Sequence, residues 1–399
     1  MLLYTPAKPA DHVPVIDLAP SLSGDPAGSK SVAEEVHRAC RDTGFLYIVN
    51  HGVSQALIDS QFAAAKAFFD LPLSDKMALH MKLSPTKSGY EPVGGQVLDS
   101  QDKSGKAAPP DLKESFYAGL ETDESNPFHG KARGFGFNQW PAIPGFREQT
   151  IAYGGALRGL GDHLLSLLAL SLDLPGTWFA DKYEHGVGSL RMIKYPPQPA
   201  EAQFNQIGAG AHTDWGGITI LAQDDIGGLE VRNASDQWIQ AKPVPGAFVI
   251  NLGDLMARWT NGIYNSNMHR VNNNASGRDR YSIPFFYSPT PTAVIEPIPT
   301  CVTPDNPPDF EVVTAAEHMA EMFKRSYGYR PPDPFTQVYQ QDPKSNAQAP
   351  PCRLSCLYPP DRWRFGGRQG QLPILLVGGR RSRGLLCGPA GRAFCRPRS

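Results

Sequence analysis

Two short segments of the chain carry residue types that could bind a catalytic metal ion. His212 and Asp214 are two positions apart in Ala211-His212-Thr213-Asp214-Trp215-Gly216-Gly217. In an extended chain such residues point to the same face. His269 follows in Asn267-Met268-His269-Arg270-Val271. Two imidazoles and one carboxylate on one face of an octahedral ion leave three positions open, which is the arrangement of non-haem iron(II) oxygenases. Because the pair His212 and Asp214 alone is a common pattern, the prediction depends on the third ligand.

A third motif could bind the second substrate of such a centre. Arg280 and Ser282 are again two positions apart and therefore share a face. A guanidinium binds a carboxylate through two parallel hydrogen bonds, and a hydroxyl can add a third. This pair is suited to the distal carboxylate of 2-oxoglutarate, whose 2-oxo acid end would occupy two of the open metal positions.

The elements that must position these residues are mostly short strands. Gly, Pro, Asn or Asp separates most of the β-type runs, which are 188–195, 217–223, 228–232, 237–240, 246–251, 268–272 and 280–287. Several short strands at close spacing predict a sandwich or barrel-like double sheet. Helical periodicity is strongest at 55–70 and 146–172, and weaker helices are predicted after a capping box at Ser31 and Glu34 and at 314–327. We expect one catalytic β-unit at about 185–290, wrapped by these helices.

The sequence resembles the isopenicillin N synthase-like and plant-type 2-oxoglutarate dioxygenases over about residues 12–335. The resemblance is carried by the blocks 49–53, 190–197, 212–217, 251–254, 269–271 and 280–286. It implies a mixed α and β fold with a distorted jelly-roll (double-stranded β-helix) core and flanking helices.

The resemblance also implies roles for individual residues. His212, Asp214 and His269 match the metal ligands, and Arg280 and Ser282 match the residues that bind 2-oxoglutarate. Tyr195 matches a tyrosine whose hydroxyl assists there. Ile193 is a departure, since many members have an Asn at this position that orients the co-substrate, which isoleucine cannot do.

Four regions are predicted along the chain. Residues 12–120 form an N-terminal helical and strand region, 185–290 the iron(II)/2-oxoglutarate dioxygenase β-core, and 291–340 a C-terminal helix that closes the domain. Residues 346–399 contain ten arginines, no lysine and one acidic residue. They predict a disordered, basic, Arg/Cys-rich tail, and a second hypothesis is an out-of-frame translation of a GC-rich gene, which resequencing would test.

Composition limits the other function classes. The formal net charge is −1, which gives no electrostatic reason to expect nucleic acid or an anionic membrane surface. No run approaches the ~18–20 apolar residues of a membrane helix, and Met1-Leu2-Leu3-Tyr4 is too short for the apolar region of a signal peptide. Cys40 and Cys301 are the only cysteines before residue 350, which fits a reducing compartment. A cytoplasmic protein is expected.

The expected activity is oxidation of a small-molecule substrate by Fe(II), 2-oxoglutarate and dioxygen, with release of succinate and CO2 and with ascorbate as a helper in vitro. Hydroxylation is the expected outcome, and desaturation or ring closure are open. The alternatives are an ethylene/succinate-forming enzyme, an oxidase of the isopenicillin N synthase type that needs no 2-oxo acid, and a non-catalytic binding protein.

Several further residues have two interpretations. Phe285, Phe286 and Trp259 belong either to the substrate pocket or to the core. The segment from Asp111 to Phe116 resembles a block at the active-site mouth of relatives and could equally be a solvated charged segment. Asp254, a second acidic candidate, is interpreted as a turn or cap residue.

Overall fold

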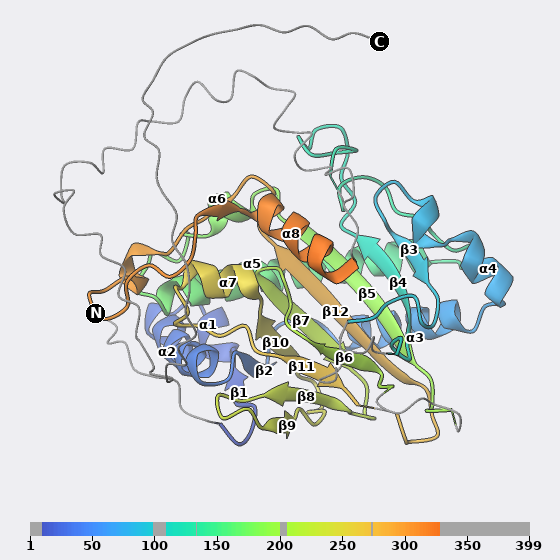
Figure 1. The fold of residues 1–399 in the computed structure, drawn as a ribbon, viewed down its shortest axis with the longest axis horizontal. Helices are drawn as coiled ribbons and strands as arrows, with labels where there is room; N and C mark the ends of the chain where they lie inside the picture. The colour runs from blue at the N-terminus through green and yellow to red at the C-terminus, as the bar shows by residue number, and fades with distance from the viewer. Residues whose placement is uncertain (1–9, 99–108, 133, 200–205, 273, 328–399) are drawn as a thin grey trace, which may run out of the picture. The chain divides into compact units, whose positions relative to one another are not determined.

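A large mixed sheet forms the centre of the structure, a computed structural model that describes residues 10–98, 109–132, 134–199, 206–272 and 274–327 (Figure 1). The strand order is β1-β2-β10-β7-β12-β5-β4-β3. The bounds are β1 Val15–Asp17, β2 Phe45–Val49, β3 Gly89–Glu91, β4 Glu114–Gly119, β5 Val187–Tyr195, β7 Ile218–Gln223, β10 Phe248–Leu252 and β12 Arg280–Ser288. Four of these strands precede residue 120, so the N-terminal part of the chain completes the sheet and does not only wrap it.

A smaller antiparallel sheet has the order β6-β11-β8-β9. Its strands are β6 Ala209–His212, β8 Leu229–Arg232, β9 Trp238–Gln240 and β11 His269–Val271. Side chains of both sheets form one buried cluster, which includes Tyr47, Ile193 and Val249 from the large sheet and Leu229 and Val271 from the small one. The two sheets therefore face each other as the double sheet that the strand pattern predicted. A further pair, β13 (Val294–Ile295) with β14 (Val313–Thr314), lies apart from both.

The strands of the large sheet are continuous apolar runs in the sequence because their side chains alternate between two faces that are both buried. In β2, Phe45 and Tyr47 join the cluster between the sheets, whereas Leu46 and Ile48 join the core on the opposite face. Successive side chains of a strand point to opposite faces, so a strand covered on both faces is apolar at nearly every position.

Helices cover the outer face of the large sheet, where α5 contacts β5, β7 and β12 and α3 contacts β5. The longer helices are α2 Pro26–Asp42, α3 Gln55–Phe69, α5 Phe146–Leu170 and α8 Ala315–Tyr327, and the short elements are α1 Ala19–Leu22, α4 Leu73–Ala78, η1 Met81–Leu83, α6 Ala180–Tyr183, α7 Asp254–Trp259 and η2 Pro299–Cys301. In α5 the buried leucines 157, 160, 164 and 168 recur at helical spacing, which is the signal of an amphipathic helix. No helix among the described residues is long and apolar enough to cross a membrane.

Some sequence-based expectations about local structure are wrong. The second helix begins at Pro26 and not at Ser31, because the Asp25 side chain accepts a hydrogen bond from the Ala27 amide and Pro26 occupies the first turn. The Gly/Pro/Ser-rich composition of residues 84–110 favours a loop, but this region contains β3. Asp111, Lys113 and Glu114 are buried and not solvated, since their charges are paired inside the protein.

The predicted domain limits 12–120, 185–290 and 291–340 stay predictions, although α8 does lie in the third range. The predicted tail 346–399 lies outside the described residues.

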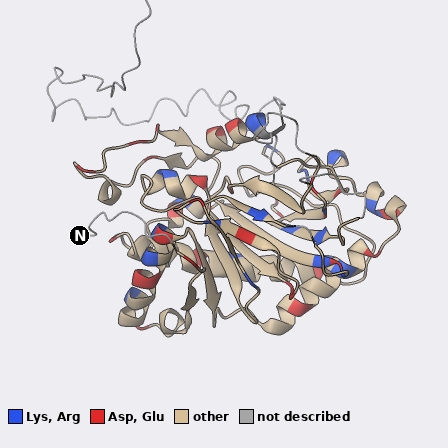
Figure 2. Cartoon of the chain, turned by 60° about the horizontal axis from the view of Figure 1, so that its bottom comes forward, with Lys and Arg blue, Asp and Glu red and all other residues tan. Residues whose placement is uncertain are grey.

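Acidic and basic residues are interspersed on the helices, and a few lie on strands in the middle of the molecule (Figure 2).

Candidate functional site

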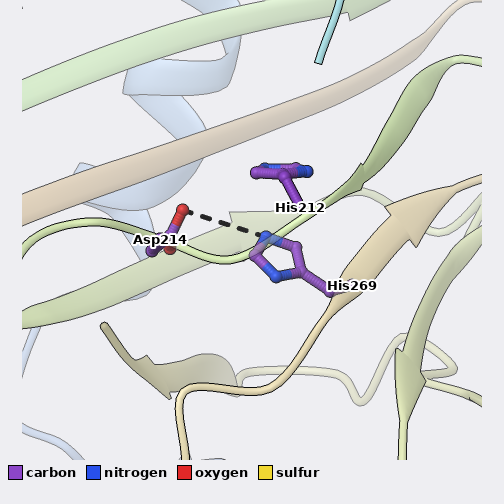
Figure 3. Close-up of side chains that lie close together, drawn as sticks. All are labelled: His212, Asp214 and His269. Carbon is purple, nitrogen blue, oxygen red and sulfur yellow. Dashed lines mark ion pairs between the residues drawn. The ribbon is translucent and has the colours of Figure 1, made fainter. Parts of the chain in front are cut away.

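The three predicted metal ligands lie together at the edge of the small sheet (Figure 3). His212 ends β6 and His269 begins β11, and these two residues are direct partners across the antiparallel pair. Asp214 follows β6 by two residues. One possible ligand atom from each of the three side chains lies within 4.8 Å of the other two. Residues that are far apart in the chain are thus brought together by strand pairing.

Both imidazoles make a local hydrogen bond through Nδ1, a long one of 3.4 Å to the Asn267 carbonyl oxygen in the case of His269. The Nδ1–H of His212 donates to the carbonyl oxygen of Gly210 at 2.7 Å, which leaves Nε2 with a free lone pair. The Nε2 atom of His269 lies 3.9 Å from Oδ1 of Asp214, and its ring stands 4.2 Å from that of His212. A hydrogen bond on one ring nitrogen that fixes the other as a ligand is the usual arrangement around protein-bound metals.

The carboxylate of Asp214 is oriented in the same way. Its Oδ2 atom accepts hydrogen bonds from Thr219 Oγ1 at 2.5 Å and from Asn251 Nδ2 at 2.7 Å, while Oδ1 faces His269. Burial alone would raise the pKa of Asp214, but His269, His212 and these two donors outweigh it and lower the pKa. An ionised carboxylate beside two imidazoles is a donor set that fits iron(II).

Thr219 should therefore influence metal affinity without touching the metal. We expect Thr219→Val to weaken binding of Fe(II) or Mn(II) about 10- to 100-fold, because loss of an outer-shell hydrogen bond frees the carboxylate to rotate. Metal titration of the apoprotein measures this. The matched control is Thr177→Val at an exposed position, which should bind metal normally. Equal metal affinity in both variants would contradict the role given to Thr219.

The buried imidazole of His212 should make the metal-free protein sensitive to acid. Burial, with a contribution from the neighbouring His269, lowers the pKa of His212 from 6.5 to about 3. The unfolded chain then binds a proton near pH 6.5 that the folded chain binds only near pH 3. Stability is thus lost as the pH falls through this window, by up to ~1.4 kcal/mol per pH unit for one proton.

Urea denaturation of the apoprotein between pH 4 and 7 tests this expectation. His212→Gln should reduce the slope of the unfolding free energy against pH by the contribution of one proton, up to ~1.4 kcal/mol per pH unit. A slope equal to that of the wild type in this variant would show that another group is responsible.

A small cavity of about 60 Å³ lies beside the triad, between the two sheets. Arg280, Ser282 and Tyr195 line it together with the three possible ligands. Arg280 is buried, yet its Nε and Nη1 atoms have no hydrogen-bond partner among the described residues, and its guanidinium carbon lies 4.7 Å from the centroid of the Tyr195 ring. Buried donors without partners are costly, and an anion in the small cavity would supply acceptors for them.

Ile193 also lines this small cavity and pairs in register with Ser282 and Ser115 on the two neighbouring strands. The position at which many relatives have an asparagine is therefore an apolar wall of the cavity. Just before β4, the buried Lys113 lines the same cavity and pairs with Asp111.

A larger cavity of about 220 Å³ opens from the other side of the triad. Five residues line both cavities, namely Leu98, Arg191, His212, Asp214 and Phe286.

The structure decides between the two interpretations of the aromatic residues. Phe286 lines the cavities, whereas Phe285 and Trp259 are buried in the core. Asp254 is the first residue of α7, and its carboxylate accepts hydrogen bonds from Thr213 and Ser266.

Sequence reasoning gave no individual role to Arg191, which lines both cavities, or to Thr219 and Asn251, which hold Asp214. Lys113, which lines the small cavity, belongs to the segment from Asp111 to Phe116, for which a position at the active-site mouth was one of two interpretations. Two of them carried a signal: Asn251 and Arg191 are polar residues within the otherwise apolar runs Phe248–Leu252 and Leu190-Arg191-Met192-Ile193. A polar group at a position expected to be buried indicates a buried partner.

In comparison with known proteins, two different family models match the chain, one in each half. Residues 13–143 match the family described as non-haem dioxygenase in morphine synthesis N-terminal. Residues 186–289 match the 2OG-Fe(II) oxygenase superfamily. The "2-oxoglutarate-Fe(II) type oxidoreductase hxnY" of Emericella nidulans is 40% identical over 323 residues, which are 79% of this chain and 90% of that protein.

Solved structures agree with the sequence relatives. A putative 2OG-Fe(II) oxygenase family protein from Caulobacter crescentus is 31% identical with a TM-score of 0.69, covering 79% of this chain and all of that one. A Neurospora crassa protein in complex with alpha-KG and thymine is 28% identical with a TM-score of 0.69, covering 79% of this chain and 97% of that one. These matches confirm the predicted jelly-roll fold class and the use of Fe(II) and 2-oxoglutarate, and they establish that the chain belongs to the 2OG-Fe(II) oxygenase superfamily.

Proposed function

We propose that His212, Asp214 and His269 hold Fe(II), and that Arg280, Ser282 and Tyr195 bind the distal carboxylate of 2-oxoglutarate. The observation that carries this proposal is the buried guanidinium of Arg280, whose Nε and Nη1 donors lack partners among the described residues and which lines the same small cavity as the triad. At one end of the cavity, the 2-oxo acid group of 2-oxoglutarate would chelate the metal. At the other end, its distal carboxylate would accept hydrogen bonds from the unpartnered donors of Arg280.

The protein's own contribution to the reaction is geometric. Thr219 and Asn251 hold the carboxylate of Asp214, and Gly210 holds the imidazole of His212, so that these side chains are oriented to hold the ion, which would bind 2-oxoglutarate and dioxygen through its remaining positions. The bound metal and co-substrate supply oxidising power through decarboxylation of 2-oxoglutarate to succinate and CO2. The larger cavity holds the primary substrate next to the open positions, where hydroxylation of a C–H bond is the proposed outcome.

A screen of small organic molecules under Fe(II), 2-oxoglutarate, ascorbate and oxygen, with succinate as the readout, tests the proposed function. Anaerobic addition of Fe(II) and 2-oxoglutarate should also give a weak visible charge-transfer band. A non-catalytic binding protein would give neither signal.

Two alternatives on the same fold are distinguished in the same assay. An oxidase that needs no 2-oxo acid would oxidise its substrate when 2-oxoglutarate is omitted. An ethylene/succinate-forming enzyme would release succinate without an added substrate and ethylene into the headspace. Either result would replace the proposed hydroxylation.

We further propose a cytoplasmic protein whose partners are a small-molecule substrate and dioxygen, and which binds neither nucleic acid nor membrane. The near-neutral net charge and the interspersed charges support this proposal. Fractionation of cells that produce the protein would test its location, and recovery in the membrane pellet would contradict it.

A further inference from the structure

A buried ammonium group in the wall of the small cavity has hydrogen-bond donors to spare. Lys113 lines this cavity, and its side chain is 2% exposed. An ammonium group has three N–H donors and no acceptor. Among the described residues, Asp111 is the hydrogen-bond partner of Lys113 Nζ. Because a buried donor without an acceptor is costly, a ligand in the cavity would supply the acceptors that the described part of the protein does not.

Lys76 shows how a buried lysine is satisfied where its role is structural. This residue pairs with Glu114, the neighbour of Lys113 in the chain, at 2.8 Å, and it also donates to the carbonyl oxygen of Phe69 at 3.1 Å. Its Nζ atom lies 5.4 Å from the centroid of the Tyr90 ring. Lys76 lines neither cavity of the site. Lys113 differs from it both in its place in the cavity wall and in its smaller set of partners.

Hydrogen bonds connect the Lys113 ammonium to the strand that carries a proposed metal ligand. Oδ2 of Asp111 accepts from this ammonium, and Oδ1 accepts from the Gly210 amide at 3.0 Å. The carbonyl oxygen of Gly210 in turn accepts the hydrogen bond from His212 Nδ1 at 2.7 Å. Gly210 and His212 belong to β6 of the small sheet, whereas Arg280 belongs to β12 of the large one. The two cations are thus tied to different sheets, Lys113 to the one that holds the metal ligand.

The cavity wall next to Lys113 lacks a polar group that relatives use. Ile193 lines the cavity at the position where many members of the family have an asparagine that orients the co-substrate. Ile193 pairs in register with Ser115 of β4, and Lys113 lies two positions before Ser115. A long side chain at such a diagonal position can reach its neighbour across the strands. The ammonium can therefore serve the region that the missing amide leaves without a donor.

Resting on the proposed metal and 2-oxoglutarate sites, we infer that Lys113 is a further co-substrate-binding residue, whose ammonium donates to the carboxylate next to the 2-oxo group. Arg280 then holds the distal carboxylate, and each end of the dianion has its own cation. Hydrogen bonds between charged groups are the strong ones, so this contact orients the chelating end without an amide at position 193.

Two 2-oxo acids separate the contributions of the two cations. 2-Oxopentanoate has the same number of carbons as 2-oxoglutarate but only the carboxylate next to the 2-oxo group. Binding of each acid to the Fe(II)-loaded protein is followed without oxygen through the visible charge-transfer band. Lys113→Met should weaken both acids by the same factor of about 10- to 150-fold, which corresponds to one hydrogen bond to a charged group. Arg280→Ala should weaken 2-oxoglutarate alone.

Two results would overturn the inference. A loss confined to 2-oxoglutarate in Lys113→Met would assign its ammonium to the distal carboxylate. Unchanged binding of both acids would leave Lys113 only as the partner of Asp111. The matched control is Lys66→Met, which removes an ammonium from an exposed ion pair with Asp70 and should bind both acids as the wild type does.

The wavelength of the charge-transfer band is a second measurement, and it needs only 2-oxoglutarate. A positive charge beside the chelating group stabilises the electron that light moves from the metal onto the ligand. At saturating 2-oxoglutarate the band should therefore lie at shorter wavelength in Lys113→Met than in the wild type, and should not move in Arg280→Ala. An unchanged band in Lys113→Met would overturn the inference even where 2-oxopentanoate binds too weakly to be measured.

Two further variants keep the test valid if Lys113→Met does not fold, since it leaves the carboxylate of Asp111 buried without its cation. Asp111→Asn/Lys113→Met removes both charges and keeps an oxygen for the Gly210 amide. Asp111→Asn alone keeps the ammonium. The double variant should bind both acids about 10- to 150-fold more weakly than Asp111→Asn does, and equal binding in this pair would refute the role given to Lys113.

Failure of this inference differs from failure of the proposed function. A wild-type protein that binds no metal, or no 2-oxoglutarate when metal is present, would reject the proposed function and the inference with it. Normal binding of both in the wild type, together with an unaffected chelate in Lys113→Met, would reject only the role of Lys113.

Discussion

Replacing Asp214 with alanine should reduce succinate formation by more than about 100-fold. Residues that only support a metal ligand reduce activity by up to about 100-fold when they are mutated, and loss of a proposed ligand itself should have a larger effect. The loss follows because Asp214 is the only carboxylate in the triad and its Oδ1 faces His269 across 3.9 Å. Two neutral imidazoles alone hold a ferrous ion weakly and in no fixed geometry. Metal titration and succinate assays at saturating iron measure the effect.

The fold should survive this change at a modest cost. Thr219 and Asn251 lose their shared acceptor, which costs about 1–3 kcal/mol for each buried donor left unsatisfied. This loss is partly offset because a buried carboxylate no longer has to be desolvated. Thermal unfolding of the apoprotein measures the change in stability.

Asp254→Asn is the matched control for Asp214→Ala. Asp254 lies nearby, and burial raises its pKa, but its carboxylate binds Thr213 and Ser266 and does not belong to the triad. This variant should still bind metal. Turnover by Asp214→Ala at saturating iron, or loss of metal from Asp254→Asn alone, would refute the assignment of Asp214 as the metal-binding carboxylate.

Replacing Arg280 with alanine should raise the dissociation constant for 2-oxoglutarate roughly 30-fold to several thousand-fold. This corresponds to the about 2–5 kcal/mol lost when one partner of a buried, hydrogen-bonded charge pair is truncated. The guanidinium is buried, and its Nε and Nη1 atoms have no partner among the described residues, whereas Nη2 makes one long hydrogen bond of 3.4 Å to Gln223 Oε1. Calorimetric titration of the metal-loaded protein gives the constant directly.

Arg278→Ala separates this effect from a general loss of positive charge. Arg278 precedes β12 and pairs with Asp225 at an exposed position. It should leave 2-oxoglutarate binding unchanged. An unaltered constant in Arg280→Ala would instead point to Lys113 or Arg191, the other two buried cations that line the small cavity among the described residues.

The proximity of His212 and Asp214 could be predicted from sequence, because residues two positions apart in an extended segment point to the same face. His212 and Asp214 are two positions apart, as are Arg280 and Ser282, and each pair does share a face. The apolar runs also located most strands, since a strand buried on both faces leaves a continuous apolar signal.

The rest of the site could not be predicted, because it depends on pairing between distant strands. The sequence left Lys113 and Glu114 with two interpretations, the active-site mouth or a solvated charged segment, because charged residues are rarely buried. Their partners are Asp111, Lys76 and Lys194, and the last two lie on elements whose position only the fold determines. The same holds for Glu91 and Arg191, which are far apart in the chain.

The opposed sheets also give the small cavity a fixed depth. Two possible metal ligands belong to the small sheet, on β6 and β11, whereas Arg280 and Ser282 belong to β12 of the large one. Sheets packed face to face lie about 10 Å apart, close to the reach of a five-carbon diacid with its contacts at each end. The protein should consequently select 2-oxo diacids by chain length. Oxaloacetate, which is one carbon shorter, could bind the metal or the guanidinium but not both at once. A longer homologue would fit only in a bent conformation.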